Sequence, residues 1–168
     1  MAYMSTPDTL YTDPVLQISA HQNLLIIAWS DAPTVPQMRE CERAGRSLAR
    51  KHSGGIALLD LILSGKANFS SEVREEAVKL NRDPTLFRLG IADAVLVSGL
   101  VGVAVRAFLS TVALLARSKV PSRVCASLAD AEEWLLPQLT RGNQSWVSGD
   151  MVKLAQPVVS ARKRDRAS

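Results

Sequence analysis

The chain has 168 residues, of which 47% are hydrophobic and 21% charged, and its formal net charge is +4. This balance is typical of a soluble globular protein, and the length suits one domain with a real core. Two cysteines and two histidines without ligand spacing argue against a disulfide framework and against a metal site. We therefore expect no metal and no cofactor.

The first elements are expected to be a hairpin. Residues 1–13 are polar and lack a basic region followed by an apolar one, so we expect a flexible N-terminus, no secretory signal and a cytoplasmic protein. Residues 15–19 alternate as a strand does, and residues 24–29 (LLIIAW) form the apolar run of a strand buried on both faces. The turn AHQN between them predicts an antiparallel pair.

Helices and strands then alternate. Thr34 and Gln37 have capping-box spacing, with Pro36 in the first turn, so a helix begins here and ends before Ser53. Further strands are predicted at 56–63, 91–97 and 120–126. Further helices are predicted from about 70 to 82, from 99 to 117 and from Ser127 onward. This ββαβαβαβα order predicts an α/β fold, with a mixed, mostly parallel sheet of about five strands and covering helices.

Residues 95–116 are the most apolar segment and are long enough to raise the question of a membrane span. The central Arg106 would cost at least ~2.5 kcal/mol at bilayer depth. We therefore interpret the segment as a strand, a glycine-assisted turn and a core helix, and expect no integral membrane segment. Any apolar surface of the helix Leu100–Arg117 that the sheet leaves uncovered is expected to be a docking or dimer face.

The C-terminal segment 140–168 mixes short apolar pieces with turn residues and charges, so it is expected to be a disordered linker and tail after a domain spanning residues 14–139. Its basic residues from 153 onward are Lys153, Arg162, Lys163, Arg164 and Arg166, against the acidic Asp165. This end therefore carries the whole net charge, and the neutral remainder argues against a nucleic-acid-binding fold. Weak contact of the tail with nucleic acid or an anionic surface remains open.

Three local patterns accompany this order of elements. They are NLLIIAW after a short first strand, DL at Asp60–Leu61, and VPSRVCASLADAEEWL at residues 120–135. Over about residues 14–139 the chain resembles the STAS domain of sulfate transporters and anti-sigma-factor antagonists, as a divergent bacterial member of the SpoIIAA-like kind. The resemblance implies a regulatory signalling module that works through protein–protein interaction.

The resemblance also implies a phosphorylation site. In anti-sigma-factor antagonists, a partner kinase phosphorylates a serine of a D-S-S-G loop, and the matching region here is DLILSGKANFSSEV. Ser70 and Ser71 fall at the expected helix start, but Phe69 and Glu72 stand where the family has aspartate and glycine. Two interpretations stay open: a phosphorylated serine at a helix start, or Ser70 as a plain N-cap worth about 1 kcal/mol.

The leading hypothesis is a non-catalytic regulatory or scaffolding module that binds a protein partner or a second copy of itself. It docks through the helix Leu100–Arg117 and the loop Ser64–Ser71. The candidate contact residues are Lys66, Phe69, Arg74, Arg106 and Ser110. The alternatives are a phosphorylation-controlled switch at Ser70 or Ser71, and a protein that binds a small apolar ligand or lipid between helix and sheet.

An enzyme is not expected, because the sequence has no Ser/His/Asp order, H-E-x-x-H, P-loop or G-x-G-x-x-G. The candidates for polar chemistry are Asp60, Asp93, His21, Arg106 and Lys66. Asp60 belongs to an apolar strand, so burial could raise its pKa. Its other interpretation is a carboxylate at a solvated strand end, or one that accepts hydrogen bonds from a helix N-terminus.

Overall fold

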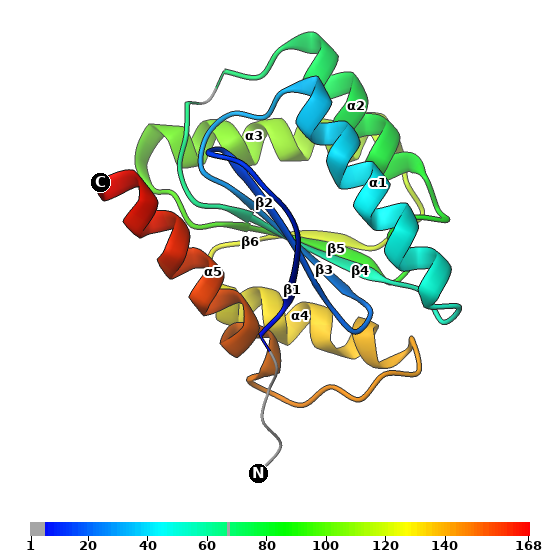
Figure 1. Ribbon diagram of the computed structural model, residues 1–168. Coiled ribbons are helices and arrows are strands. Elements are labelled where there is room, and N and C mark those ends of the chain that lie inside the picture. Colours follow the sequence, from blue (N-terminus) through cyan, green and yellow to red (C-terminus); the bar gives the residue numbers. More distant parts are fainter. Residues whose placement is uncertain (1–5, 67) are drawn as a thin grey trace.

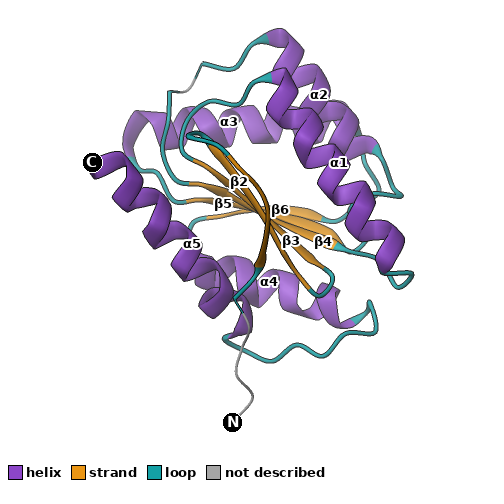
Figure 2. Cartoon of the chain, viewed as in Figure 1, coloured by secondary structure: helices purple, strands orange, loops and turns teal. Residues whose placement is uncertain are grey.

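In the computed structural model, which describes residues 6–66 and 68–168, one six-stranded sheet lies between two layers of helices (Figure 1, Figure 2). The strands are β1 (Asp8–Thr12), β2 (Leu16–His21), β3 (Leu24–Trp29), β4 (Ala57–Ile62), β5 (Gly90–Val95) and β6 (Ser122–Cys125). They follow the chain order across the sheet, antiparallel from β1 to β3 and parallel from β3 to β6. The predicted α/β class with a mixed, mostly parallel sheet is confirmed, with six strands instead of about five.

The helices divide between the two faces of the sheet. They are α1 (Val35–Lys51), α2 (Ser71–Arg82), α3 (Gly99–Ala116), α4 (Leu128–Thr140) and α5 (Asp150–Ala167). The three crossovers from β3 to β6 all advance in one direction, so right-handed connections place α1, α2 and α3 on the same face. The helices α4 and α5 cover the other face (Figure 1). The central strands are thus buried on both sides, which explains the continuous apolar run of β3.

Local signals in the sequence explain where the helices begin. The hydroxyl of Thr34 accepts a hydrogen bond from the Gln37 N–H, and the Gln37 side chain accepts one from the Thr34 N–H, which confirms the predicted capping box. Between β5 and α3, Gly99 has a φ of +71° and a Cβ at Gly102 would collide with the carbonyl oxygen of Val97. These glycines permit the tight turn from strand to helix, as predicted.

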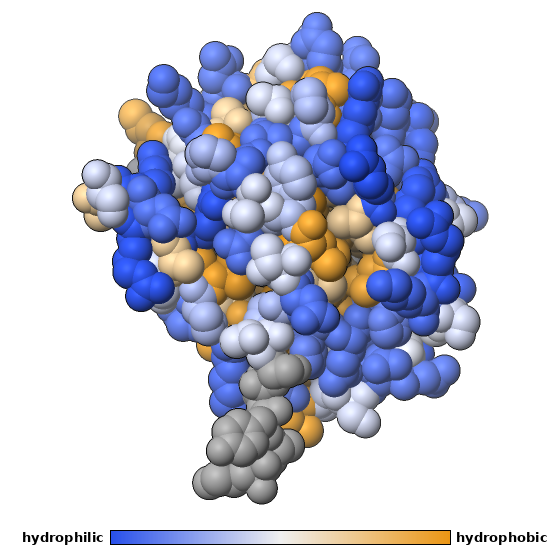
Figure 3. Space-filling view, in the orientation of Figure 1, coloured by the Kyte–Doolittle hydropathy of each residue, from blue (hydrophilic) through white to orange (hydrophobic). Residues whose placement is uncertain are grey.

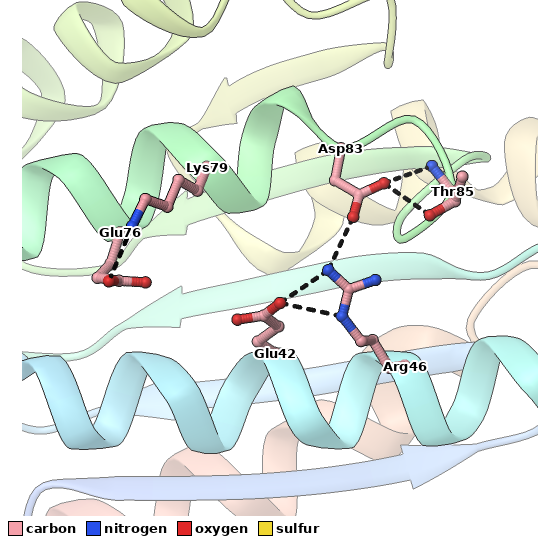
Figure 4. Close-up of polar contacts among 6 residues, drawn as sticks. All are labelled: Glu42, Arg46, Glu76, Lys79, Asp83 and Thr85. Atoms are coloured by element: carbon pink, nitrogen blue, oxygen red, sulfur yellow. Dashed lines mark hydrogen bonds and ion pairs between the residues drawn. The ribbon is translucent and has the colours of Figure 1, made fainter.

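Polar contacts join α1 to the segment that follows α2 (Figure 4). The Arg46 guanidinium on α1 donates to Glu42 one turn earlier and to Asp83 at 2.9 Å, and Asp83 also accepts from the backbone and hydroxyl of Thr85. Both carboxylates raise the pKa of Arg46 further. Hydrophilic side chains of this kind dominate the face in Figure 3, with smaller apolar areas between them.

The prediction for the N-terminus needs correction. Residues 1–13 were expected to be flexible, but Asp8–Thr12 form β1, which pairs antiparallel with β2. The prediction for residues 1–5 lies outside the described part of the chain. The strand β1 is mostly exposed, with Leu10 48% exposed, so it carries little apolar signal. Its place is determined by backbone pairing with β2.

The prediction for the C-terminus was wrong, because residues 150–167 form α5 instead of a disordered tail. The buried side chains of α5 recur at helical spacing and pack on the sheet and on α4: Met151, Leu154, Ala155, Val158 and Val159. Pro157 and the run of charges obscured this pattern in the sequence, but Pro157 lies on the exposed side of the helix. The ordered domain therefore continues well past residue 139.

Candidate functional site

A pocket of about 90 Å³ lies between the sheet and the helices α1, α2 and α3. Most of its lining is apolar, for example Ile27, Leu58, Met38, Val73, Val105 and Val112. It extends to the loops Asp31–Pro33 and Ser64–Lys66, which follow β3 and β4. The pocket therefore reaches the C-terminal edge of the parallel strands, where open α/β sheets commonly bind ligands.

Three carboxyl groups belong to the lining, and two of them, Asp60 and Asp93, stand side by side on the sheet. Asp60 on β4 and Asp93 on β5 are paired in the parallel register, so both side chains project from the same face of the sheet. Both line the pocket, and they share a hydrogen bond. The indole Nε1 of Trp29, on the adjacent strand β3, donates to Asp60 Oδ1 at 2.9 Å.

The environment of the pair raises the pKa of both acids, but to different extents. Burial raises the pKa of Asp60 to about 6, although the hydrogen bonds from Asp93 and Trp29 counteract part of this effect. Burial and the charge of Asp60 together raise the pKa of Asp93 well above its usual value. Because the pKa of Asp93 is raised further than that of Asp60, Asp93 is the partner that keeps its proton to higher pH and donates it to the Asp60 carboxylate. Of the two interpretations of Asp60 that the sequence left open, burial with a raised pKa agrees with this geometry, and the carboxylate accepts from the Trp29 indole instead of from a helix N-terminus.

No cation of the described residues pairs with the charge on these two acids. Among the ion pairs of residues 6–66 and 68–168, none involves either acid. Lys66 lines the same pocket, but it is exposed at the rim, and its backbone N–H donates to Asp31. Asp60 keeps part of its surface accessible, so its carboxylate can accept a hydrogen bond from a small molecule in the pocket.

Cys41 also lines the pocket, but its chemistry is that of a core residue. Burial, followed by the nearby charge of Asp60, raises the pKa of this thiol well above its usual value. A thiol that stays protonated is a poor nucleophile and a poor metal ligand. Cys41 and Cys125 are both buried and unpaired, as the sequence predicted. Residues 6–66 and 68–168 contain no group of acidic, histidine or cysteine side chains arranged to hold a metal ion.

Of the predicted contact residues, Lys66 and Phe69 belong to this pocket. Phe69, just before α2, stacks on Phe108 of α3 with ring centroids 3.9 Å apart, and both rings line the pocket. Arg74 is exposed on α2, Ser110 is exposed on α3, and neither residue is part of the lining.

Of the residues predicted for polar chemistry, some line the pocket and others do not. Asp60, Asp93 and Lys66 all line the pocket, whereas the partly exposed Arg106 does not. His21, at the end of β2, packs edge-on against Trp146 with ring centroids 5.7 Å apart, and it is also absent from the lining. Trp29 is the functional residue that sequence reasoning missed. Its parallel pairing beside Ile62, two residues after Asp60, brings the indole within reach of Asp60.

Ser70 is the N-cap of α2, as one interpretation of the sequence predicted. Its hydroxyl accepts a hydrogen bond from the Val73 N–H at 3.2 Å, and the exposed Ser71 donates to the Glu72 carboxylate at 3.3 Å. A backbone N–H and both serine hydroxyls lower the pKa of Glu72. Glu72 therefore already places an anion at this helix start. Phosphorylation of Ser70 or Ser71 remains a prediction.

The helix α3 shows apolar side chains on its outer side. Only 22% of its residues are buried, and Leu100, Val103 and Leu114 are 89%, 63% and 76% exposed. Its inner side lines the pocket through Val105 and neighbouring residues. By length and composition alone it is the one helix of the described chain that could cross a membrane. In this fold, one side of the helix packs on the protein and the other remains uncovered.

Comparison of the chain with models of protein families, with curated proteins and with solved structures gave no match. The site is therefore interpreted from its own geometry.

Proposed function

We propose that the pocket binds a small, mostly apolar molecule that presents an amine or a hydroxyl group to Asp60. The observation that carries this proposal is the pair Asp60 and Asp93 inside a mostly apolar pocket. An anionic carboxyl group in such surroundings costs free energy even with two neutral donors, because no cation of the described residues accompanies it. A bound ammonium group would supply that cation and a hydroxyl group a further donor, whereas a carboxylate ligand would be repelled.

The proposed role is non-catalytic binding, as in a carrier or a ligand-sensing regulator. Trp29 and Asp93 hold the Asp60 carboxylate in place with two hydrogen bonds, so its orientation is prepared before a ligand arrives. Cys41, a nucleophilic residue type in the lining, carries a thiol whose raised pKa keeps it protonated. The pocket is thus suited to recognising a donor group.

Three ligands of equal chain length test the proposal: pentylamine, pentanol and pentanoate. At pH 7.5 the amine and the alcohol should raise the melting temperature and bind saturably in calorimetry, because they stabilise only the folded state. Pentanoate should do neither. Equal responses to all three compounds would show that the pocket recognises only apolar surface.

The matched variants are Asp60→Asn and Asp8→Asn. Asp60→Asn keeps an oxygen that can accept from Trp29 but removes the charge, so the preference for the amine should fall about tenfold. Asp8 is exposed on β1, and its substitution should leave binding unchanged. If Asp60→Asn binds the amine as tightly as the wild type does, the role assigned to Asp60 is wrong.

We also propose a second role, in which α3 joins two copies of the chain. Its exposed stripe consists of Leu100, Val103, Ala107, Thr111 and Leu114. The spacing along this stripe reads the same in both directions from Ala107. In an antiparallel pair of helices crossing at Ala107, each exposed leucine meets the other leucine of the second copy, as an isologous interface requires.

The small residue at the crossing point would let two such helices approach closely. This role agrees with the predicted docking helix and with the proposed relation to SpoIIAA-like regulatory modules. It also explains why so apolar a surface is left uncovered.

Light scattering after size-exclusion chromatography tests the dimer. The wild type should have twice the mass of one chain, and Leu114→Glu should have the mass of one chain. Val147→Glu is the matched control, because Val147 is a similarly exposed apolar residue, 63% exposed, outside α3. A wild type that stays monomeric at high concentration, or that instead floats with lipid vesicles, would contradict the proposed dimer.

A further inference from the structure

A second pocket, of about 380 Å³, lies where α5 meets the C-terminal ends of β3 and β4. Its lining consists of Ser30, Leu63, Ser64, Arg162, Lys163, Arg166 and Ala167. This set holds three basic side chains and two hydroxyl groups, and it includes no acidic side chain. Ser64 also lines the first pocket, so the two sites share one edge of the sheet.

The key residue of this pocket is Arg162, which is only 4% exposed. Its Nε donates to the Ser30 hydroxyl at 2.9 Å, and its Nη1 donates to the backbone oxygen of Asp13 at 2.8 Å. Its Nη2 is buried and has no hydrogen-bond partner within the described chain. Buried donors are almost always satisfied, and an unpaired one on a charged group is especially costly.

The surrounding acids do not neutralise this pocket. Burial lowers the pKa of Arg162, and the charges of Asp13 and Asp165 only partly oppose this effect, while the charge of Asp31 interacts with that of Arg166. The Asp13 carboxylate is already bound to the N–H groups of Val15 and Leu16. The Asp31 carboxylate likewise accepts from the N–H groups of Ala32 and Lys66. These contacts leave the basic side chains of the pocket available.

We propose that this second pocket binds a phosphate group, which accepts from Arg162 Nη2 and faces the charges of Lys163 and Arg166. Guanidinium groups match phosphate oxygens in geometry and charge. The Ser30 hydroxyl accepts from Arg162, so its own proton is free to be donated to the anion. Ser64 instead donates its proton to the Ser30 carbonyl at 2.8 Å, which fixes the loop that borders the pocket. Phosphate binding at this site does not depend on the ligand role or the dimer role proposed above.

Titration with inorganic phosphate, at constant ionic strength and with chloride as the reference ion, tests the site by calorimetry and by thermal shift. The full chain should bind phosphate saturably. Lys163→Gln and Arg166→Gln should each weaken binding several-fold, up to about tenfold, through loss of a charge-assisted contact. Arg164→Gln is the matched control, because Arg164 is an exposed basic residue of the same helix outside the lining.

Arg162→Lys tests the central residue, since it keeps the charge but removes the unpaired nitrogen. This change also alters the contacts with Ser30 and Asp13. If the Arg162→Lys variant does not fold, the variants Lys163→Gln and Arg166→Gln decide the result. A second arm uses phosphatidylcholine vesicles with and without phosphatidic acid, which separates a lipid phosphate from a free one.

Binding in either arm that Arg166→Gln weakens and Arg164→Gln does not supports the site. Absence of phosphate-specific binding in both arms overturns it, as does an equal loss in Arg164→Gln, which would indicate diffuse attraction to a basic helix.

Discussion

At the scale of single residues, the most unusual feature is a pair of like acids on adjacent strands. Asp60 and Asp93 stand in mostly apolar segments, and each alone would be a costly buried charge. Together they need only one charge, because the protonated acid donates to the ionised one. Trp29 stabilises the ionised partner. The arrangement keeps a hydrogen-bond acceptor in the pocket, but it lowers the free energy of unfolding near neutral pH.

This cost predicts an unusual dependence of stability on pH. The pKa of Asp60 rises from 3.8 in the unfolded chain to about 6 in the folded one. The folded state therefore binds the extra proton between these values, and the contribution of Asp60 is lost as pH rises through 6. Relative to Asp60→Asn, the wild type should lose roughly 2–3 kcal/mol of unfolding free energy between pH 4 and pH 8.

Urea unfolding of both proteins at several pH values measures this difference. The acids with lowered pKa values, such as Asp13 and Asp83, lose their contribution only as pH falls below about 4, and they do so in both proteins. If the two stability curves run parallel from pH 4 to pH 8, Asp60 does not titrate as described.

The two serines at the start of α2 should differ in their effect on stability. Ser70→Ala removes the acceptor for the Val73 N–H and should cost about 1 kcal/mol. Ser71→Ala should change stability by less than about 0.5 kcal/mol, because Ser71 is an exposed residue of the first turn. Chemical denaturation of the two variants measures both effects. A loss in Ser70→Ala as small as that expected for Ser71→Ala would mean that the cap at Ser70 does not stabilise the helix.

At the scale of elements, the start of α5 is capped by a side chain from another helix. Its N-cap residue Gly149 has no side chain to accept from the free N–H groups. The buried carboxylate of Glu132, on α4, accepts instead from the N–H groups of Gly149 and Val152, at 2.6 and 2.9 Å. An acid at this position also suits the dipole of α5. The helix start is therefore set by tertiary contact.

This contact predicts a large effect for one glutamate and a small one for its neighbour. Glu132→Ala should lower the unfolding free energy by about 2–3 kcal/mol, because two partly buried N–H groups lose a charged acceptor. Glu132→Gln, which keeps one acceptor, should cost less. Glu133→Ala is the control, since Glu133 is exposed. Thermal and urea unfolding report the values, and similar losses at both positions would contradict this account.

At the scale of the whole molecule, each face of the sheet has its own apolar core, and α5 closes one of them. The side chains that α5 buries belong to the same apolar core as strand residues such as Ile26, Leu59 and Ala94. Without α5 this face would be partly open to water, at about 25 cal/mol for each Å² of apolar surface exposed. The C-terminal segment is thus part of the fold.

Two truncations test this conclusion. Deletion of residues 150–168 should give an insoluble or unfolded protein, whereas deletion of residues 163–168, which are exposed, should leave the melting temperature nearly unchanged. Circular dichroism and solubility measurements distinguish them. A stable, cooperative protein after the longer deletion would show that α5 is dispensable.

Much of this fold was predictable from local patterns. The apolar run of β3, the capping box at Thr34 and the serine caps of α2 and α4 act over a few residues, so the sequence by itself determined them. Their alternation along the chain also determined a parallel sheet with helical crossovers. The apolar strand around Asp60 allowed a raised pKa as one of two interpretations, and burial is the cause of the rise in the folded protein.

Other features were decided only by the tertiary structure, because they join residues that are distant in the chain. Sheet register brings Asp93 beside Asp60, and the docking of α5 brings Arg162 to Ser30, 132 residues away. The cap from Glu132 stabilises the start of α5, although the local sequence there resembles that of a disordered tail. Each of these contacts depends on how the elements pack, and the spacing of residues along the chain does not predict that packing. Both candidate sites are assembled in this way, from strand ends and helices that meet only in the folded protein.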